Sequence, residues 1–83
     1  MKLLYFAHLR TKIGTAEEQL DPPAAVTDVT GLIEWLKGRG PRFADALGNP
    51  KALRVAVNQT YVGRHHPVKP GDEVAIFPPV TGG

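Results

Sequence analysis

The sequence predicts an α+β fold in which one main helix packs across one face of a mixed sheet. The first observation is the order of the elements, since two strand-like segments precede one amphipathic helix and two more follow it. The second is that residues 2–9 are apolar on both alternating faces, as in a central strand covered on both sides. Because a helix that links strands of one sheet makes a right-handed crossover, we expect the last strand beside the first, in the middle of the sheet.

The composition excludes several classes of protein. The chain has 83 residues, of which 42% are hydrophobic and 22% charged, so we expect one globular domain. It has no cysteine, which excludes a disulfide framework, a thiolate metal site and a thiol nucleophile of its own. The net charge of +2 comes from scattered Lys and Arg without an aromatic-interleaved basic stripe, which argues against nucleic-acid binding. No apolar run approaches the ~20 residues of a membrane span, and the chain does not begin like a signal peptide, so we expect a cytoplasmic protein without membrane contacts.

The first strand is expected over residues 2–9, with His8 inside it as a partly buried structural histidine. Residues 11–14 are expected to turn the chain. A more polar partner strand over residues 15–20 then closes a hairpin.

The main helix is expected from Thr27 to about Lys37, with the Thr27 side chain as its N-cap. Gly31 inside this helix costs about 1 kcal/mol relative to alanine, which suggests that the helix approaches the sheet closely there. Trp35 is expected at the edge of the apolar stripe, as a boundary core residue. The stripe itself has the spacing i, i+3, i+4, i+7 and consists of Val29, Leu32, Ile33 and Leu36.

The second half of the chain predicts a short helix and two strands. The helix is expected over residues 41–47, with Phe43, Ala46 and Leu47 turned inward. Strands are expected over residues 53–58 and 72–77, and residues 59–62 either continue the former or form a short edge strand. This arrangement is the β-grasp, or ubiquitin-like, fold, with a domain over residues 1–77 and a tail over 78–83.

The tail ends on a bare diglycine. Pro78 and Pro79 lock φ and withhold backbone donors, so they end the last strand and extend the chain outward. Six extended residues span about 20 Å, which is enough to enter the pocket of another protein. Gly82 and Gly83 lack a Cβ and therefore fit a channel that admits only backbone. A frayed terminus is the alternative reading.

An exposed apolar patch is expected where the tail begins. Val74 and Ile76 share one face of the last strand, which leaves Phe77 on the other face. We expect Phe77, Pro78 and Pro79 to form the patch, with Tyr61 as a neighbour from an adjacent strand. The alternative is that Phe77 is buried in a second small core. Adjacent His65 and His66 do not predict a metal site, because strand neighbours point oppositely and no third ligand is spaced nearby.

The whole chain resembles the MoaD-type small subunits of molybdopterin synthase, a family of ubiquitin-like sulfur carriers. Two positions depart from the family pattern: Thr11 stands where an acidic residue is common, and Thr81 where Ala or Ser is common. The residues that carry the resemblance are Leu9-Arg10, Gly14, Val57-Asn58-Gln59-Thr60, His66-Pro67, Gly71-Asp72-Glu73-Val74 and Phe77-Pro78-Pro79-Val80-Thr81-Gly82-Gly83.

The resemblance implies a reaction at the terminal carboxylate. Gly83 would be adenylated by a separate activating enzyme that supplies ATP and Mg²⁺, and sulfur from a persulfide donor would then displace AMP to leave a thiocarboxylate. The large subunit of molybdopterin synthase, expected in a hetero-tetramer, would bind Val80, Thr81 and Gly82 in a channel and receive the sulfur for cyclic pyranopterin monophosphate. The chain itself is expected to bind no cofactor or metal and to catalyse nothing alone.

Two other classes of function stay open at this point. The chain could be a carrier for thiamin synthesis or tRNA thiolation, or a ubiquitin-like protein conjugator. It could also be a β-grasp binding module whose tail is incidental. The identity of the partner separates the carriers from one another, and indifference to the loss of Gly83 would favour the binding module.

Overall fold

The computed structural model describes residues 1–78, so the predictions for Pro79, Val80, Thr81, Gly82 and Gly83 lie outside the described residues. Within this range, the longest helix has nine residues, and no helix is long and apolar enough to cross a membrane. The elements follow in the order β1 (Lys2–Tyr5), α1 (His8–Ile13), β2 (Glu17–Gln19), α2 (Val29–Lys37), α3 (Pro41–Ala46), the 3-10 turn η1 (Pro50–Ala52), β3 (Arg54–Val57), β4 (Thr60–Val62) and β5 (Glu73–Phe77).

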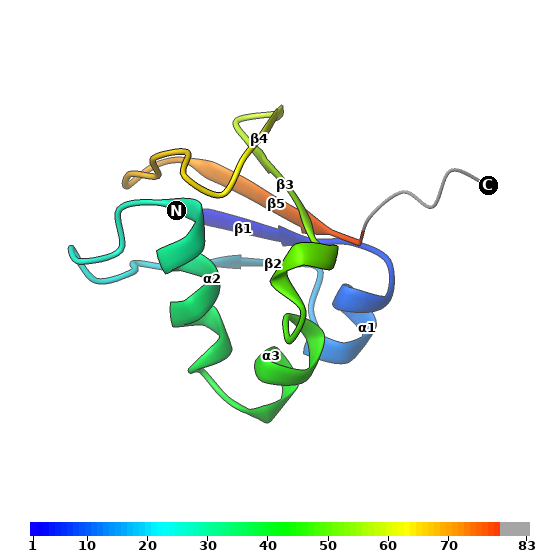
Figure 1. The fold of residues 1–83 in the computed structure, drawn as a ribbon. Coiled ribbons are helices and arrows are strands. Elements are labelled where there is room, and N and C mark those ends of the chain that lie inside the picture. The colour runs from blue at the N-terminus through cyan, green and yellow to red at the C-terminus, as the bar shows by residue number, and fades with distance from the viewer. Residues whose placement is uncertain (79–83) are drawn as a thin grey trace.

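The strands form one mixed sheet in the order β2-β1-β5-β3-β4. Strands β1 and β5 pair in parallel at its centre, and every other pair is antiparallel. Figure 1 shows the three α-helices on the same side of this sheet, which leaves its other face without a helical cover. The predicted β-grasp fold, with the last strand beside the first, is therefore confirmed.

The core lies between the sheet and the helices. Alternate residues of the two central strands point into it, and Leu3, Val74 and Ile76 have no exposed surface. From the opposite side the predicted stripe of α2 is buried, because its four apolar residues recur on one face of the helix. Trp35 is partly buried against this core, as expected of a boundary residue.

Helix α1 is a correction to the predicted first strand and turn. Strand β1 ends at Tyr5, and His8 is the exposed first residue of a helix instead of a partly buried strand residue. The chain leaves the sheet at Ala7, whose φ of 56° lies in the left-handed region. Leu9 and Ile13 are four residues apart and both buried, which anchors α1 to the core.

The predicted cap of the main helix was wrong by one residue. Asp28, not Thr27, is the N-cap, and its Oδ1 accepts a hydrogen bond of 2.8 Å from the Gly31 backbone N–H. The reason given for Gly31 was also wrong, because a Cβ there would meet the Asp28 carboxylate oxygen at 3.1 Å and not the sheet. Gly31 thus leaves room for the capping side chain.

The remaining elements agree with prediction to within one or two residues. Helix α3 begins with Pro41 at its first turn, and Ala46 and Leu47 are buried while Phe43 packs against the core. Strand β4 is a short edge strand, joined to β3 through Asn58 and Gln59, which both have positive φ. This pair of left-handed residues is typical of a tight hairpin turn.

Candidate functional site

The last strand holds the root of the tail in a fixed position. Strand β5 pairs with β1 on one edge and with β3 on the other, so its backbone is bound on both sides. Val74 and Ile76 are fully buried under the helices, while Phe77 and Pro78 are only half-buried. The predicted tail therefore begins at Pro78, directly after a strand that is paired on both edges.

Three aromatic rings gather where β5 ends, on the face of the sheet that no helix covers, which is called the open face below. Phe77 meets Phe6 with 5.8 Å between ring centroids and Tyr61 with 5.5 Å, both in edge-to-face geometry. Phe6 is 47% exposed and Tyr61 is 68% exposed, and they are the large hydrophobic side chains that stand out among the described residues. Phe6, Tyr61 and Phe77 are called the aromatic patch below.

One row of residues across the open face is mostly apolar beside this patch. The strand register aligns Leu4, Ala75, Ala56 and Tyr61 across four strands. Because the two alanines carry only a methyl group, the middle of this row is lower than its ends. The open face thus has small side chains in its middle, next to the aromatic patch.

The structure brings together most of the predicted patch and adds a residue to it. Tyr61 is a neighbour of Phe77, as predicted. The predicted patch did not include Phe6, because a strand covered on both faces over residues 2–9 would bury its side chain. The alternation of Leu4 and Phe6 on one face, opposite Leu3 and Tyr5, was the signal that could have found it.

Phe77 belongs to this surface cluster and not to the core. It is absent from the buried cluster under the helices, and both rings that it contacts are exposed. Burial in a second small core, the alternative from sequence, is therefore wrong. Binding of a partner to the patch stays a prediction.

A small hollow of about 210 Å³ lies beside the root of the tail, and Pro78 forms part of its wall. His8 from α1 also lines it, together with Lys12 and Asp45, whose side chains form an exposed ion pair of 3.3 Å. Across residues 1–78 no three His, Asp or Glu side chains gather closely enough to hold a metal ion.

Three titrating groups with shifted pKa values form a network on the helical side of the sheet. The buried Tyr5 hydroxyl donates a 2.7 Å hydrogen bond to Glu18, and burial followed by this contact raises the pKa of Tyr5. Arg39 donates two hydrogen bonds to the same carboxylate, of 2.8 and 3.2 Å. Desolvation alone would raise the pKa of Glu18, but the bonds from Arg39 and Tyr5 outweigh it and lower that pKa. This network ties β1 and β2 to the end of α2 and serves the fold.

A second polar cluster fixes the start of β5. Asp72 is buried, and its carboxylate accepts hydrogen bonds from the Asn58 side chain at 3.1 Å and from the Lys69 backbone N–H at 3.0 Å. Desolvation would raise the pKa of Asp72, yet these bonds and the Lys69 ammonium lower it. Asp72 thereby joins the β3–β4 turn to the loop before β5.

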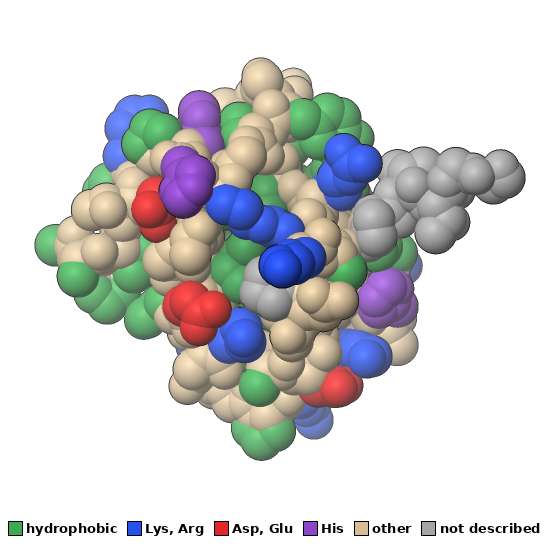
Figure 2. Space-filling view, viewed as in Figure 1, with side chains coloured by type: hydrophobic (Ala, Val, Ile, Leu, Met, Phe, Trp, Pro, Cys, Tyr) green, Lys and Arg blue, Asp and Glu red, His purple; other side chains and the backbone are tan. Residues whose placement is uncertain are grey.

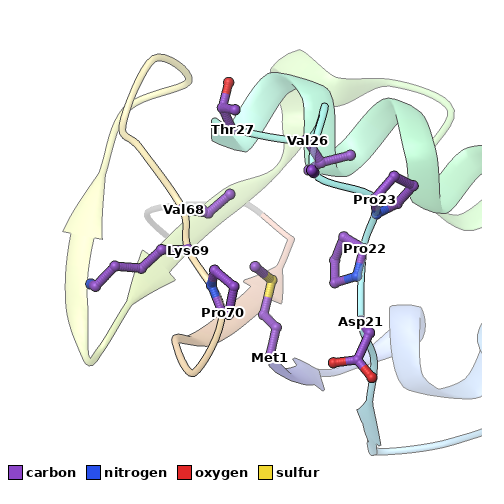
Figure 3. A pocket seen from close by; sticks show the side chains of 10 residues that line it. Met1, Asp21, Pro22, Pro23, Val26, Thr27, Val68, Lys69 and Pro70 are labelled. Carbon is purple, nitrogen blue, oxygen red and sulfur yellow. The ribbon is translucent and has the colours of Figure 1, made fainter.

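Another cavity, of about 370 Å³, lies near the other end of the sheet, by the start of β1. Figure 3 shows Met1 at its base, with Pro22, Pro23 and Val26 on one side and Val68 and Pro70 on the other. Its walls are mostly apolar, and Lys69 at its rim is already paired with Asp72 at 3.0 Å. The cavity holds no arrangement of groups for chemistry on the tail.

The comparisons with known proteins agree with this geometry. The molybdopterin synthase sulfur carrier subunit of Escherichia coli (strain K12) is 43% identical over 83 residues, which cover 100% of this chain and 99% of that protein. A solved structure from Pyrococcus furiosus, described as molybdopterin converting factor, subunit 1, has a TM-score of 0.76 at 32% identity and 95% coverage of both chains. The small archaeal modifier protein 1 of Methanosarcina acetivorans has a TM-score of 0.73 at 26% identity, covering 99% of this chain and 94% of that one. The sequence pattern of the ThiS family matches residues 3–83, and this chain therefore belongs to the ThiS family.

Proposed function

We propose that this chain is the sulfur carrier subunit of a molybdopterin synthase, and that it carries sulfur as a thiocarboxylate on Gly83. The observation that carries the proposal is the position of β5, the central strand that precedes the tail in the sequence. The diglycine of the sequence follows a central strand that ends in an exposed aromatic patch, in a chain 43% identical to a molybdopterin synthase sulfur carrier subunit. The proposal includes the cytoplasmic location expected from the sequence.

The first step activates the terminal carboxylate. An α-carboxylate has a pKa of about 3.3–3.7 in model peptides, so it is ionised at neutral pH. In this form it is inert as an electrophile. Its oxygen attacks the α-phosphorus of ATP, pyrophosphate leaves, and the acyl carbon becomes part of a mixed anhydride with AMP. No phosphate-binding glycine-rich loop is found in the sequence, so the activating enzyme supplies the site, ATP and Mg²⁺.

The second step exchanges oxygen for sulfur. The terminal sulfur of a persulfide donor attacks the acyl carbon and AMP leaves, which forms an acyl disulfide. A thiol of the donor system then cleaves the disulfide and leaves the thiocarboxylate on Gly83. The chain has no cysteine, so both sulfur atoms of the intermediate come from outside it.

The carrier then presents this group to the large subunit of the synthase. In this step Phe77, Tyr61 and Phe6 bind the partner while Pro78 and Pro79 direct Val80 to Gly83 into its channel. The thiocarboxylate sulfur replaces an oxygen substituent on a carbon of cyclic pyranopterin monophosphate, and water then hydrolyses the acyl–sulfur bond, so that the sulfur stays on the pterin and the carrier returns with a carboxylate. The transferase activity belongs to the complex, in which the carrier supplies the sulfur and the large subunit the site; we expect a hetero-tetramer.

The intact mass of Gly83-terminated protein tests the proposal. The chain is produced together with the activating enzyme and sulfur donor of the host, and its mass is compared with that of protein made without them. We expect the replacement of one oxygen by sulfur, located on the C-terminal peptide. As a control, the same activating enzyme must be shown to modify its own carrier. If the mass of this chain is then unchanged, its function as a sulfur carrier is ruled out.

One observation favours a second function, conjugation to proteins. The similarity to a small archaeal modifier protein reaches a TM-score of 0.73 over nearly the whole chain. The same adenylated terminus would then be attacked by a lysine amine and form an isopeptide bond. Digested cell proteins would carry lysines bearing the C-terminal residues of this chain, and their absence where thiocarboxylate is abundant would leave the carrier function alone.

A further inference from the structure

A hollow lined by two arginines lies next to the aromatic patch. Its volume is about 270 Å³, and it is formed by the start of β3 together with β4 and the residues after it. Arg54, Arg64 and Tyr61 provide its polar groups, and the remaining lining residues are Leu53, Val55, Val62 and Gly63. Among residues 1–78 no carboxylate lines it, so a ligand there meets two arginines without an acidic neighbour in the lining.

Arg64 is held in place by contacts at both ends of the residue. Its Nη2 donates a 2.9 Å hydrogen bond to the Leu53 carbonyl oxygen. Its own carbonyl oxygen accepts hydrogen bonds from the Thr30 backbone N–H at 3.1 Å and the Thr30 hydroxyl at 3.0 Å. The guanidinium is therefore oriented before any ligand arrives, with N–H groups left over for an acceptor.

Arg54 lies on the open face beside the root of the tail. In the sheet register it is directly opposite Phe77, and its side chain is exposed. Within residues 1–78 neither Arg54 nor Arg64 forms an ion pair with a carboxylate. Figure 2 shows several Lys and Arg side chains close together near the centre of the view, over the region of β3 and η1 in Figure 1.

The charge of the open face differs between its two ends. Near the start of β1, Lys2 pairs with Glu17 at 3.5 Å and lies opposite Glu73 in the register, so positive and negative charges alternate. At the tail end Arg54 lies on this face opposite Phe77, and it lines the hollow together with Arg64. A docking protein would thus meet a polarised surface that favours one orientation.

We propose that this hollow binds an acidic side chain, Asp or Glu, of the protein that docks on the aromatic patch. The inference rests on the proposed function, since it concerns the partner of that same face. Tyr61 joins the two features, because it lines the hollow and packs on Phe77 at 5.5 Å. A free anion at such an exposed pair of arginines is screened by water and salt. A carboxylate delivered by a protein that covers the patch is desolvated by the same contact, which strengthens its pairing with the guanidinium groups.

The test measures binding of the cognate molybdopterin synthase large subunit to wild type and to Arg54→Gln, at 50 and 300 mM NaCl. Arg42→Gln is the matched control, since Arg42 is an exposed arginine on α3, on the helical side of the sheet. We expect Arg54→Gln to weaken binding by about 5- to 20-fold at low salt, mostly through slower association, with a smaller effect at high salt. Arg54→Lys keeps the charge without the fork and should recover part of the affinity. Arg42→Gln should bind as wild type.

Three results would overturn the inference. If Arg54→Gln and Arg64→Gln both bind the large subunit as wild type does, with the same salt dependence, the hollow takes no part in docking. If they lose no more affinity than Arg42→Gln, only net charge matters. If inorganic phosphate shifts the amide signals of Arg54, Tyr61 and Arg64 saturably in the free carrier while the variants keep their partner affinity, the hollow is a small-anion site. Failure of wild type to bind the large subunit at all would instead count against the proposed function.

Discussion

Truncation of Phe77 separates docking from stability. In the folded protein Phe77→Ala removes two edge-to-face ring contacts, to Phe6 at 5.8 Å and to Tyr61 at 5.5 Å. Such pairs contribute roughly 0.5–1.5 kcal/mol each, and the ring is only half-buried. We therefore expect the free energy of unfolding to fall by about 1–2 kcal/mol, below the roughly 3–5 kcal/mol typical of a fully buried phenylalanine.

The same substitution should have a larger effect on the complex. An aromatic anchor at the centre of an interface contributes about 2–4 kcal/mol, which corresponds to a loss of about 30- to 700-fold in affinity for the large subunit. Denaturant unfolding measures the first quantity and calorimetric titration the second. Phe43→Ala is the matched control, because this aromatic packs against the core on the helical side and meets Tyr5 at 6.4 Å. It should lower stability and leave affinity unchanged. A Phe77→Ala protein that loses 3 kcal/mol or more of stability, about the amount for a core position, and still binds as wild type would refute the docking role.

Three further predictions concern the cap, the acid limb of stability and the tail. Asp28→Ala removes the acceptor of the Gly31 N–H and should lower the free energy of unfolding in urea by about 1 kcal/mol. Thr27→Ala, at the position that the sequence predicts as the cap, should lower it by about half of that or less. Equal losses would contradict the assignment of Asp28 as the N-cap. Folding lowers the pKa of Glu18 from its ordinary 4.5, so its contribution to the free energy of unfolding is complete above that pH and is lost as the pH falls through the folded pKa. Glu18→Gln should therefore flatten the decline of stability below pH 4.5. A decline as steep as in wild type would be inconsistent with this. Gly82→Ala adds a methyl group in the tail and should slow thiocarboxylate formation while the free energy of unfolding changes by less than about 0.5 kcal/mol; an unimpaired rate, measured by intact mass over time, would show that the channel admits a side chain.

The fold could be predicted from the sequence because its periodic elements are strong. The stripe on α2 and the alternation of Val74, Ile76 and Phe77 each determine one face, and the doubly apolar first strand places β1 at the centre. These signals depend on spacing alone, so they survive without knowledge of tertiary contacts.

Helix α1 could not be separated from β1 by the same means. The apolar run of β1 continues through Phe6 and Ala7 to Leu9 in the first turn of α1, whose start has no side-chain cap. The signals in favour of a helix were Leu9 and Ile13 four residues apart and Gly14, whose φ of 95° ends it in a left-handed cap. The conformation of Ala7, which has φ of 56°, is set by packing of the helix under the sheet and leaves no mark in the sequence.

The site was predicted in part for related reasons. The position of Phe77 follows from alternation, and its contact with Tyr61 follows from the strand order. Phe6 and the pairing of Arg54 with Phe77 in the register depend on how β1 ends and how β3 aligns with β5, which only the structure gives. The hollow lined by Arg54 and Arg64 likewise lies between the start of β3 and the residues that follow β4, so it depends on how these two strands pair.

Conversion of cyclic pyranopterin monophosphate by the assembled synthase tests the sulfur carrier function most directly. The large subunit is combined with carrier that has passed through the activating enzyme and sulfur donor, either as wild type or with Gly83 deleted. Deletion withdraws the carboxylate by one residue, about 3.4 Å, while Phe6, Tyr61, Phe77 and Pro78 stay in place to bind. We predict a single turnover of the pterin by wild type and none by the truncated carrier, with affinities for the large subunit that differ far less. Normal turnover by the truncated carrier would contradict the assignment of sulfur transfer to Gly83.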